Sequence, residues 1–379
     1  MLQPLRIIQV VNVRWFNATA WYGLFLARLL RDAGHKVLAL VPAGTECCER
    51  AQAMGLDTLT PDLNTASPLR LAASLKALHG IVRDFSPQVV NCHRGEGFLL
   101  WGLLRAMGHD FALIRTRGDQ RPPKNNAPNR LLHRRADALI ATNSRTARAL
   151  AGLGVPNERI TTILGGVDTS VYSFVPEGRE RVRQEFGFTP EHVVLGLLGR
   201  FDRVKGQIEL LRALAGLRAR NAALEASLRL ILMGFTTSMK QEEIEAAIRE
   251  LKLNDVVHIT GKRSDVPACI SAFDLGVIAS QGSEAIARAA FEIMACKVPL
   301  VGTDVGVMPD LLEPEALAPT GDAPALENLL ERAVNPDFRA ALRERQAGRI
   351  SELDSRGFLY RTLAVYHKAL QRRGLSRLI

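Results

Sequence analysis

Two glutamates, Glu284 and Glu292, stand eight positions apart in the C-terminal half of the chain. A strand-like apolar run at 275–280 precedes them, so the first is expected in a strand-to-helix loop and the second inside the following helix. Eight helical positions advance about 12 Å, close to the separation of the sugar ring and the ribose in a nucleotide-sugar. A carboxylate accepts paired hydrogen bonds from neighbouring hydroxyls, and a loop that opens a helix offers free N–H groups to a diphosphate. The pair is equally consistent with acids that only cap and solvate an amphipathic helix.

Two cations, Arg200 and Lys205, stand upstream of the glutamates. A predicted strand at 193–198 comes before them, and a predicted amphipathic helix begins at residue 207. The two cations are therefore expected at the carboxyl edge of a sheet, where open α/β folds bind anionic ligands. They could neutralise the charge that develops on a diphosphate as a glycosyl–phosphate bond breaks. Either cation alone would be typical of a solvated surface.

In this order and separation, the four residues resemble the donor site of the retaining glycosyltransferases of family four, or group one, which have the GT-B fold. The resemblance covers most of the chain. It implies that Arg200 and Lys205 bind the pyrophosphate of the donor. It also implies that Glu284 lies beside the donor sugar and that Glu292 binds the ribose hydroxyls. His93, at the end of a predicted strand, is similar to the family's histidine that contacts the donor sugar.

Two further segments resemble motifs of the family. Residues 164–168 are similar to the segment before the interdomain crossing, and residues 261–267 to the turn that frames the nucleobase. The resemblance adds these expected donor-binding residues: Arg263, Ala285, Ile286 and Ala287.

The resemblance also implies a mechanism. The acceptor hydroxyl attacks the face from which the diphosphate leaves, and the departing phosphate takes the proton, so the anomeric configuration is retained. The residues implied to be catalytic are His93, Arg200, Lys205 and Glu284. No metal and no cofactor are expected, because the cations replace a metal. The nucleotide-sugar is a substrate, expected as a UDP-sugar with GDP- and ADP-sugars as alternatives.

Three positions depart from the family pattern. Residues 14–19 replace its usual Gly-Gly loop, and bulkier residues adopt positive φ less readily than glycine. Residues 285–288 replace the Gly or Pro and the aromatic residue that usually follow the first glutamate. Lys297 occupies a position that is commonly glycine. The selectivity for the donor sugar therefore does not follow from the resemblance.

Strand and helix patterns alternate along the chain, which predicts parallel, doubly wound α/β sheets. The resemblance specifies a GT-B arrangement, with two Rossmann-like domains facing across a cleft and a C-terminal helix crossing back to the first. The expected parts are an acceptor-binding domain at 1–170, a linker at 171–190, a nucleotide-sugar domain at 191–355 and the returning helix at 356–379.

The net charge of +10 is concentrated in the first half of the 379 residues. Residues 1–170 contain 21 Lys and Arg against 12 Asp and Glu, whereas the remainder is nearly balanced. An acceptor domain with this excess favours an anionic glycan or glycolipid acceptor, or contact with an anionic membrane. Residues 115–126 are expected as a basic, turn-rich loop. Its Arg and Lys side chains could bind phosphates of the acceptor, and an exposed, solvated loop is the alternative. The expected acceptor-binding residues are Asn17, Arg94, Arg117, Arg121 and Lys124.

The five cysteines show neither a disulfide framework nor metal-ligand spacing. No apolar run approaches the roughly 20 residues that span a bilayer, and the first apolar run is read as a buried strand rather than a signal peptide. A cytoplasmic protein, with peripheral contact to the inner face of the membrane, is expected. The basic region from Arg115 to Arg135 and the overall sequence pattern are similar to those of bacterial cell-envelope glycosyltransferases, particularly those of lipopolysaccharide core assembly.

Three alternatives remain open from the sequence. A nucleotide-sugar epimerase on a similar fold would release UDP without an acceptor. A non-catalytic, two-lobed sugar- or anion-binding protein would be expected to carry an export signal. A nucleic-acid binder would fit the charge, but no helix-turn-helix, zinc or RNA-binding motif accompanies it, so no nucleic-acid partner is expected.

Overall fold

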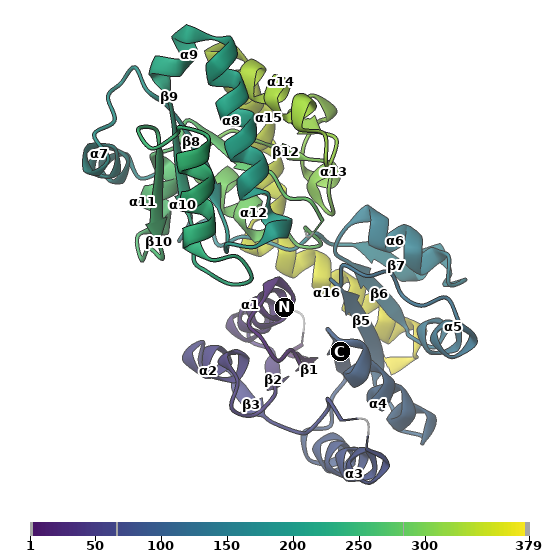
Figure 1. The fold of residues 1–379 in the computed structure, drawn as a ribbon. Helices are drawn as coiled ribbons and strands as arrows, with labels where there is room; N and C mark the ends of the chain where they lie inside the picture. The colour runs from purple at the N-terminus through teal and green to yellow at the C-terminus, as the bar shows by residue number, and fades with distance from the viewer. Residues whose placement is uncertain (1–2, 66, 283, 376–379) are drawn as a thin grey trace. The chain divides into compact units, whose positions relative to one another are not determined.

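The computed structural model describes residues 3–65, 67–282 and 284–375. The chain forms two compact units, unit 1 made of Met1–Gly166 with Ser355–Ile379 and unit 2 of Val167–Asp354. Each unit is a parallel sheet with helices packed against it (Figure 1). The predicted pair of Rossmann-like α/β domains is thereby confirmed.

Within the described residues, unit 1 has a seven-stranded sheet in the order β3-β2-β1-β4-β5-β6-β7. Its strands are β1 (Arg6–Val10), β2 (Lys36–Leu40), β3 (Asp57–Leu59), β4 (Val89–Cys92), β5 (Ala112–Arg117), β6 (Ala138–Ala141) and β7 (Ile160–Thr162). Its helices are α1 (Ala18–Asp32), α2 (Glu46–Ala53), α3 (Pro68–Phe85), α4 (Gly95–Ala106), α5 (Ala127–Arg134), α6 (Ser144–Ala151) and α16 (Ser355–Arg372). The strand order reverses between β1 and β4, which makes their carboxyl ends the switch point of the sheet.

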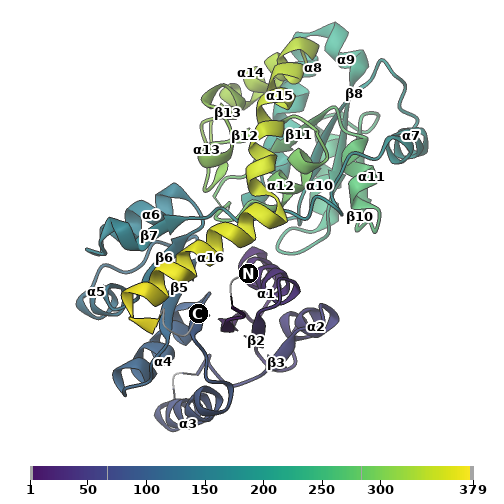
Figure 2. The same ribbon diagram turned by 180° about the vertical axis from the view of Figure 1, so that it is seen from behind.

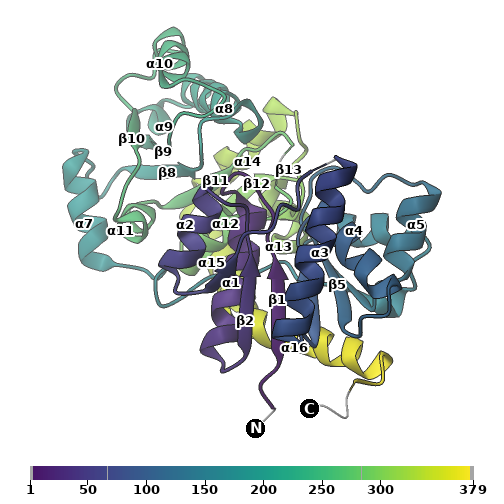
Figure 3. The ribbon, with the colours of Figure 1, turned by 90° about the horizontal axis from the view of Figure 1, so that it is seen from below.

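Side chains alternate between the two faces of the unit 1 sheet. Ile8 and Val90 belong to an apolar core with Phe98 and Trp101 of α4, and α3 contacts α4 on this side (Figure 3). Gln9 and Asn91, the next residues along the same strands, face the other way and have buried polar side chains. An apolar core on one face therefore leaves the opposite face able to carry a buried polar network.

Helix α16 comes from the end of the chain but packs within unit 1, against α1, β5 and β6 (Figure 2). The rings of Tyr22 and Phe358 lie edge to face, 4.8 Å apart. Gly166 allows α16 to lie close to the backbone of residue 166, because a Cβ at this position would lie 2.6 Å from the Cβ of Phe358. The predicted return of the C-terminal helix to the first domain is confirmed, with residues 376–379 of the predicted segment outside the described part.

Unit 2 has a six-stranded sheet in the order β10-β9-β8-β11-β12-β13 within the described residues. Its strands are β8 (Val193–Leu198), β9 (Leu228–Met233), β10 (Val257–Gly261), β11 (Leu275–Ile278), β12 (Leu300–Thr303) and β13 (Leu317–Ala318). Its helices are α7 (Pro176–Glu185), α8 (Gln207–Arg220), α9 (Ala222–Ser227), α10 (Gln241–Glu250), α11 (Val266–Ser271), α12 (Arg288–Ala295), α13 (Met308–Leu311), α14 (Ala323–Ala333) and α15 (Pro336–Leu353). Here the order reverses between β8 and β11, the two strands that precede the predicted donor-site residues.

The boundaries of the units differ from the expected ones. Unit 2 begins at Val167, and the expected linker at 171–190 belongs to it. This segment contains α7, which packs against α11, and its Arg179 donates to Asp274 at 2.6 Å. The polar composition that suggested a linker instead supplies ion pairs that fix a helix to unit 2.

All five cysteines are buried and unpaired. Burial raises the pKa of the Cys269 thiol to about 11, so this thiol is protonated at neutral pH. None of the helices in the described residues is long and apolar enough to cross a membrane.

Candidate functional site: the switch point of unit 2

The loops that follow β8 and β11 are joined to one another. The N–H of Gln281 donates to the carbonyl of Val204 at 2.8 Å. Gly206 has φ of 75°, and a Cβ built there would lie 1.8 Å from the carbonyl oxygen of Ala279. Only glycine fits this approach, because the backbone is left-handed and no space remains for a side chain. The close approach brings the end of the first loop against the beginning of the second.

This contact places Lys205 beside Glu284. The Lys205 Nζ lies 2.5 Å from Oε1 of Glu284, whose side chain is 3% exposed. The Ser280 hydroxyl donates to the same oxygen at 2.6 Å. The backbone of Glu284 is also held, since its carbonyl accepts from Val307 N–H at 2.7 Å. The structure therefore brings together two residues that stand 79 positions apart, and it adds Ser280, whose role the sequence analysis missed.

Arg200 lies on the same loop as Lys205 but is more open to solvent. Its side chain is 43% exposed, and the guanidinium contacts Asp202 at 3.0 Å. The buried side chain of Gln207 donates to its carbonyl at 2.9 Å. Lys205 is therefore held against the buried carboxylate of Glu284, whereas the more exposed Arg200 side chain is accessible to a ligand from solvent.

Glu292 lies within α12, as predicted, and is buried at 7% exposure. Arg288, one turn earlier, contacts its Oε1 at 2.8 Å. Burial and the neighbouring Glu292 carboxylate raise the pKa of Tyr172 well above its usual value. Tyr172 is a residue that sequence reasoning missed, because it falls in the segment expected to be a linker. Glu284 precedes α12 by four residues, so the predicted helical rise of about 12 Å between the two acids does not apply.

The other expected donor-binding residues have different surroundings. Arg263 donates to both Glu185 oxygens and contacts Asp265 at 2.9 Å, and these bonds raise its pKa further above the usual range. Its charge is thus neutralised by an ion-pair network that ties α7 to the loop after β10, rather than left for a donor. Ala285, Ile286 and Ala287 are buried, so a donor would meet their backbone and not their side chains.

His93 lies in unit 1, in a buried polar network on the sheet face opposite the apolar core. Its Nε2 lies 2.8 Å from Oε1 of Gln9, and the Gln9 amide donates to the Tyr366 hydroxyl of α16 at 2.8 Å. Asn91 also donates to Tyr366, at 2.9 Å, and accepts from Thr116. An amide oxygen only accepts, so Nε2 carries the histidine proton. The ring is fully buried, which differs from the predicted contact with a donor sugar.

The buried histidine predicts a loss of stability in acid. Burial and the charge of Arg115 lower the pKa of His93 from 6.5 to about 3. Between these values the unfolded chain binds the proton more readily than the folded one, so unfolding becomes easier as pH falls below about 6.5. The cost is at most about 1.4 kcal/mol per pH unit for this group. Hydrogen exchange of the buried amides of unit 1 in the full chain, corrected for the intrinsic exchange rate at each pH, measures this cost, and His93→Gln should flatten the dependence. An unchanged dependence in the variant contradicts the assignment.

The expected basic loop at 115–126 is partly a strand. Arg115 and Arg117 belong to β5 and are buried, because Asp119 compensates both charges at 2.8 and 3.3 Å. Arg121 and Lys124 are exposed, as a loop predicts. Hydropathy did not reveal the buried arginines, since it carries no information on their pairing with Asp119.

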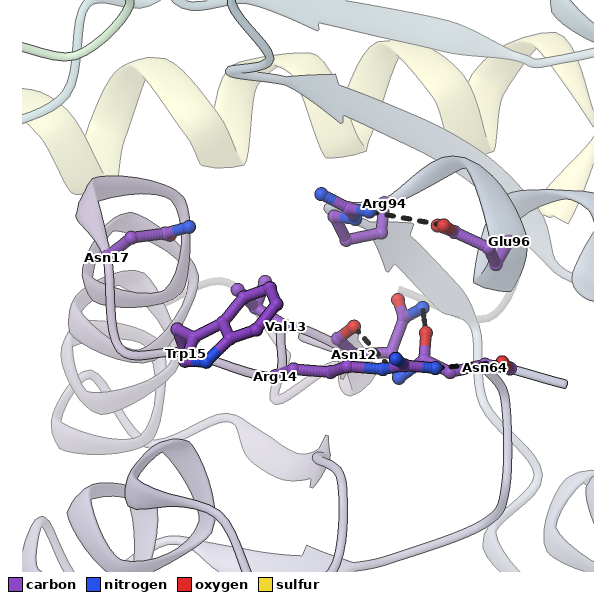
Figure 4. Close-up of a pocket in the computed structure, with 8 residues that line it drawn as sticks. All are labelled: Asn12, Val13, Arg14, Trp15, Asn17, Asn64, Arg94 and Glu96. Carbon is purple, nitrogen blue, oxygen red and sulfur yellow. Dashed lines mark hydrogen bonds and ion pairs between the residues drawn. The ribbon is translucent and has the colours of Figure 1, made fainter. Parts of the chain in front are cut away.

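A pocket of about 270 Å³ lies at the switch point of the unit 1 sheet, after β1 and β4 (Figure 4). It contains two of the expected acceptor-binding residues, Asn17 and Arg94. Asn17 also caps α1, since its side chain accepts from the N–H of Ala20 at 3.1 Å. The residues that line the pocket are Asn12, Val13, Arg14, Trp15, Asn17, Asn64, Arg94 and Glu96.

Comparisons with known proteins find matches to both units of the chain. A model described as Glycosyltransferase Family 4 matches residues 20–171, and one described as Glycosyl transferases group 1 matches residues 178–349. The D-inositol 3-phosphate glycosyltransferase of Pseudarthrobacter chlorophenolicus is 28% identical over 55% of this chain and 50% of its own length. The lipopolysaccharide core biosynthesis mannosyltransferase LpsB of Rhizobium meliloti is 30% identical over 56% of this chain and 57% of its own. The chain thus matches about half the length of these curated relatives.

The fold is shared with solved structures. HepE from Anabaena, in complex with UDP and glucose, superposes with a TM-score of 0.77 at 20% identity, over 95% of this chain and 98% of that one. One family model covers most of unit 1 and the other most of unit 2, and the chain belongs to the family four, group one glycosyltransferases with the GT-B fold.

Proposed function

We propose that this protein transfers a sugar from a UDP-sugar to a hydroxyl of its acceptor, with retention of the anomeric configuration. The observation that carries the proposal is the Lys205–Glu284 pair at the switch point of unit 2, 2.5 Å apart. It supplies an ammonium and a carboxylate at the sheet edge where nucleotides bind in this class of fold. The complex of the structural relative HepE with UDP and glucose supports the choice of donor.

The proposed reaction assigns a separate task to each side chain. The bond between the anomeric carbon and the diphosphate oxygen breaks, and the acceptor oxygen bonds to the same face as its proton passes to the departing phosphate. Lys205 keeps two of its three N–H donors for phosphate oxygens after one is used on Glu284. Arg200 adds a second cation where the charge develops. Glu284 accepts from the sugar hydroxyls, and Glu292 accepts from the ribose.

We further propose that the product belongs to a cell-envelope glycan. The similarity to a lipopolysaccharide core mannosyltransferase and to an inositol-phosphate glycosyltransferase supports this proposal. Incubation with a panel of UDP-, GDP- and ADP-sugars, with and without acceptor extracts, tests it through release of the nucleotide. Turnover of the sugar without any acceptor would favour the epimerase alternative instead.

The two glutamates should affect nucleotide binding differently. Glu292→Ala removes the proposed ribose acceptor and should weaken UDP binding by about tenfold or more, the cost of a buried hydrogen-bonding group left without its partner. Glu284→Ala should leave UDP binding intact, because Lys205 then turns fully to the phosphates, but it should abolish most transfer. Calorimetry with UDP measures both effects.

Glu250→Ala, at an exposed position on α10, is the matched control and should bind UDP as the wild type does. Equal losses of UDP affinity in the Glu284 and Glu292 variants would contradict the division of roles.

A further inference from the structure

We infer that the pocket in unit 1 binds a sugar or cyclitol that carries a phosphate or carboxylate, with the ring against Trp15 and the anion between Arg14 and Arg94. The inference rests on the proposed function and specifies its acceptor. It follows from the size, the shape and the charge of the pocket.

The size of the pocket favours a ligand smaller than the donor. Ligand pockets for drug-sized molecules usually measure about 300–1,000 Å³, and this pocket measures about 270 Å³. This volume suits a single ring with one substituent. Its place at the switch point of the unit 1 sheet is also the edge where α/β folds bind ligands.

Trp15 gives the pocket an apolar wall. Its side chain is 76% exposed, whereas Trp101 is fully buried. Figure 4 shows Trp15 and Arg14 on one loop, with Arg94 and Glu96 facing them from another segment. The indole offers a broad, rigid apolar surface with little entropy to lose, together with an N–H donor at its edge. The apolar face of a pyranose or cyclitol ring matches this wall.

Amide groups form the polar wall of the pocket. Asn12 is buried at 3% exposure; its Nδ2 donates to Oδ1 of Asn64 at 2.9 Å, and Asn64 donates back to the Asn12 carbonyl. The Asn12 Oδ1 has no partner among the residues that the structure describes. A Cβ at Gly97 would lie 3.0 Å from this oxygen, so glycine there leaves it uncrowded. A buried acceptor of this kind calls for a donor such as a ligand hydroxyl.

The charges around the pocket favour an anion. Arg94 contacts Glu96 at 3.1 Å and Asp119 at 3.9 Å. Asp119 is already neutralised by the two buried arginines of β5. Among the residues that line the pocket, Arg14 and Arg94 carry two positive charges against the single carboxylate of Glu96, which leaves a positive excess. A neutral sugar leaves this excess uncompensated, whereas a phosphate or carboxylate balances it and accepts bidentate bonds from arginine.

The test is ligand-observed NMR and Trp fluorescence on the full chain in the presence of saturating UDP. The probes are glucose 6-phosphate and glucuronate, with glucose and inorganic phosphate as controls. At least one anionic sugar should bind about tenfold more tightly than glucose and than inorganic phosphate, as expected from one charge-assisted hydrogen bond or more. The phosphate and carboxylate arms tell the two sources of charge apart.

Arg14→Gln and Arg94→Gln should each reduce binding of the anionic sugar by about tenfold while UDP affinity stays unchanged. Trp15→Ala should reduce it as well and remove the ligand-induced change in fluorescence. Arg148→Gln, at an exposed position on α6, is the matched control.

Glucose binding as tightly as both anionic sugars overturns the inference, and so does inorganic phosphate binding as tightly as they do. The proposed function fails separately, by the loss of UDP binding or of transfer from every donor in the panel.

Discussion

Replacing Lys205 with methionine is expected to lower the transfer rate by a factor of about 10²–10³, the range seen when one preorganised charge-stabilising donor is removed. Methionine keeps much of the apolar stem but removes the ammonium that lies 2.5 Å from Glu284. UDP affinity should fall as well, because a phosphate loses a cation. Arg200→Ala should lower the rate similarly, and Lys205→Arg, which keeps the charge, should restore part of it. Steady-state kinetics with a UDP-sugar measure these effects.

The chain offers a control on the same loop. Arg203 stands between the two cations in sequence, but its side chain is 82% exposed and contacts Glu243 at 3.5 Å. Arg203→Ala should therefore leave the rate within about twofold, since an exposed ion pair contributes little. If the Lys205 and Arg203 variants retain the same rate, the ammonium does not stabilise the leaving group.

The sequence predicted those parts of the site that depend on local pattern. The run predicted as a strand at 193–198 coincides with β8, and Glu292 falls inside a helix as expected. Parallel strands end at a common sheet edge, so it also followed that Lys205 and Glu284 share one edge. Periodicity and strand polarity suffice for these statements, because both are properties of short segments.

The remaining features depend on tertiary contacts that a single sequence does not encode locally. The direct pairing of Lys205 with Glu284 depends on loops held at Gly206, and the burial of Arg115 depends on Asp119. Tyr172 interacts with Glu292, and the segment that contains Tyr172, expected to be a linker, belongs to unit 2. The polar network around His93 required α16, which comes from the far end of the chain.

Gly206→Ala is expected to disrupt the donor site without touching any group that binds the ligand. At φ of 75°, an alanine costs about 1–2 kcal/mol in backbone strain alone. Its Cβ would also lie 1.8 Å from the Ala279 carbonyl oxygen, so the two loops must part and Lys205 must leave Glu284. Both the stability of unit 2 and its affinity for UDP should fall.

Gly187→Ala separates backbone strain from the clash. Gly187 also lies in unit 2 and has φ of 66°, but a Cβ there meets nothing within 4 Å. Gly187→Ala should therefore lower the stability of unit 2 by the backbone strain alone, and this variant should bind UDP like the wild type. Hydrogen exchange resolves the two units, which a single unfolding curve of a two-unit chain does not. The Gly206 variant should show exchange accelerated along β11 and weakened UDP binding. If both glycine variants lose the same stability and keep the same UDP affinity, the contact between the two loops does not position the lysine, and the site must be held by α8 and α12 alone.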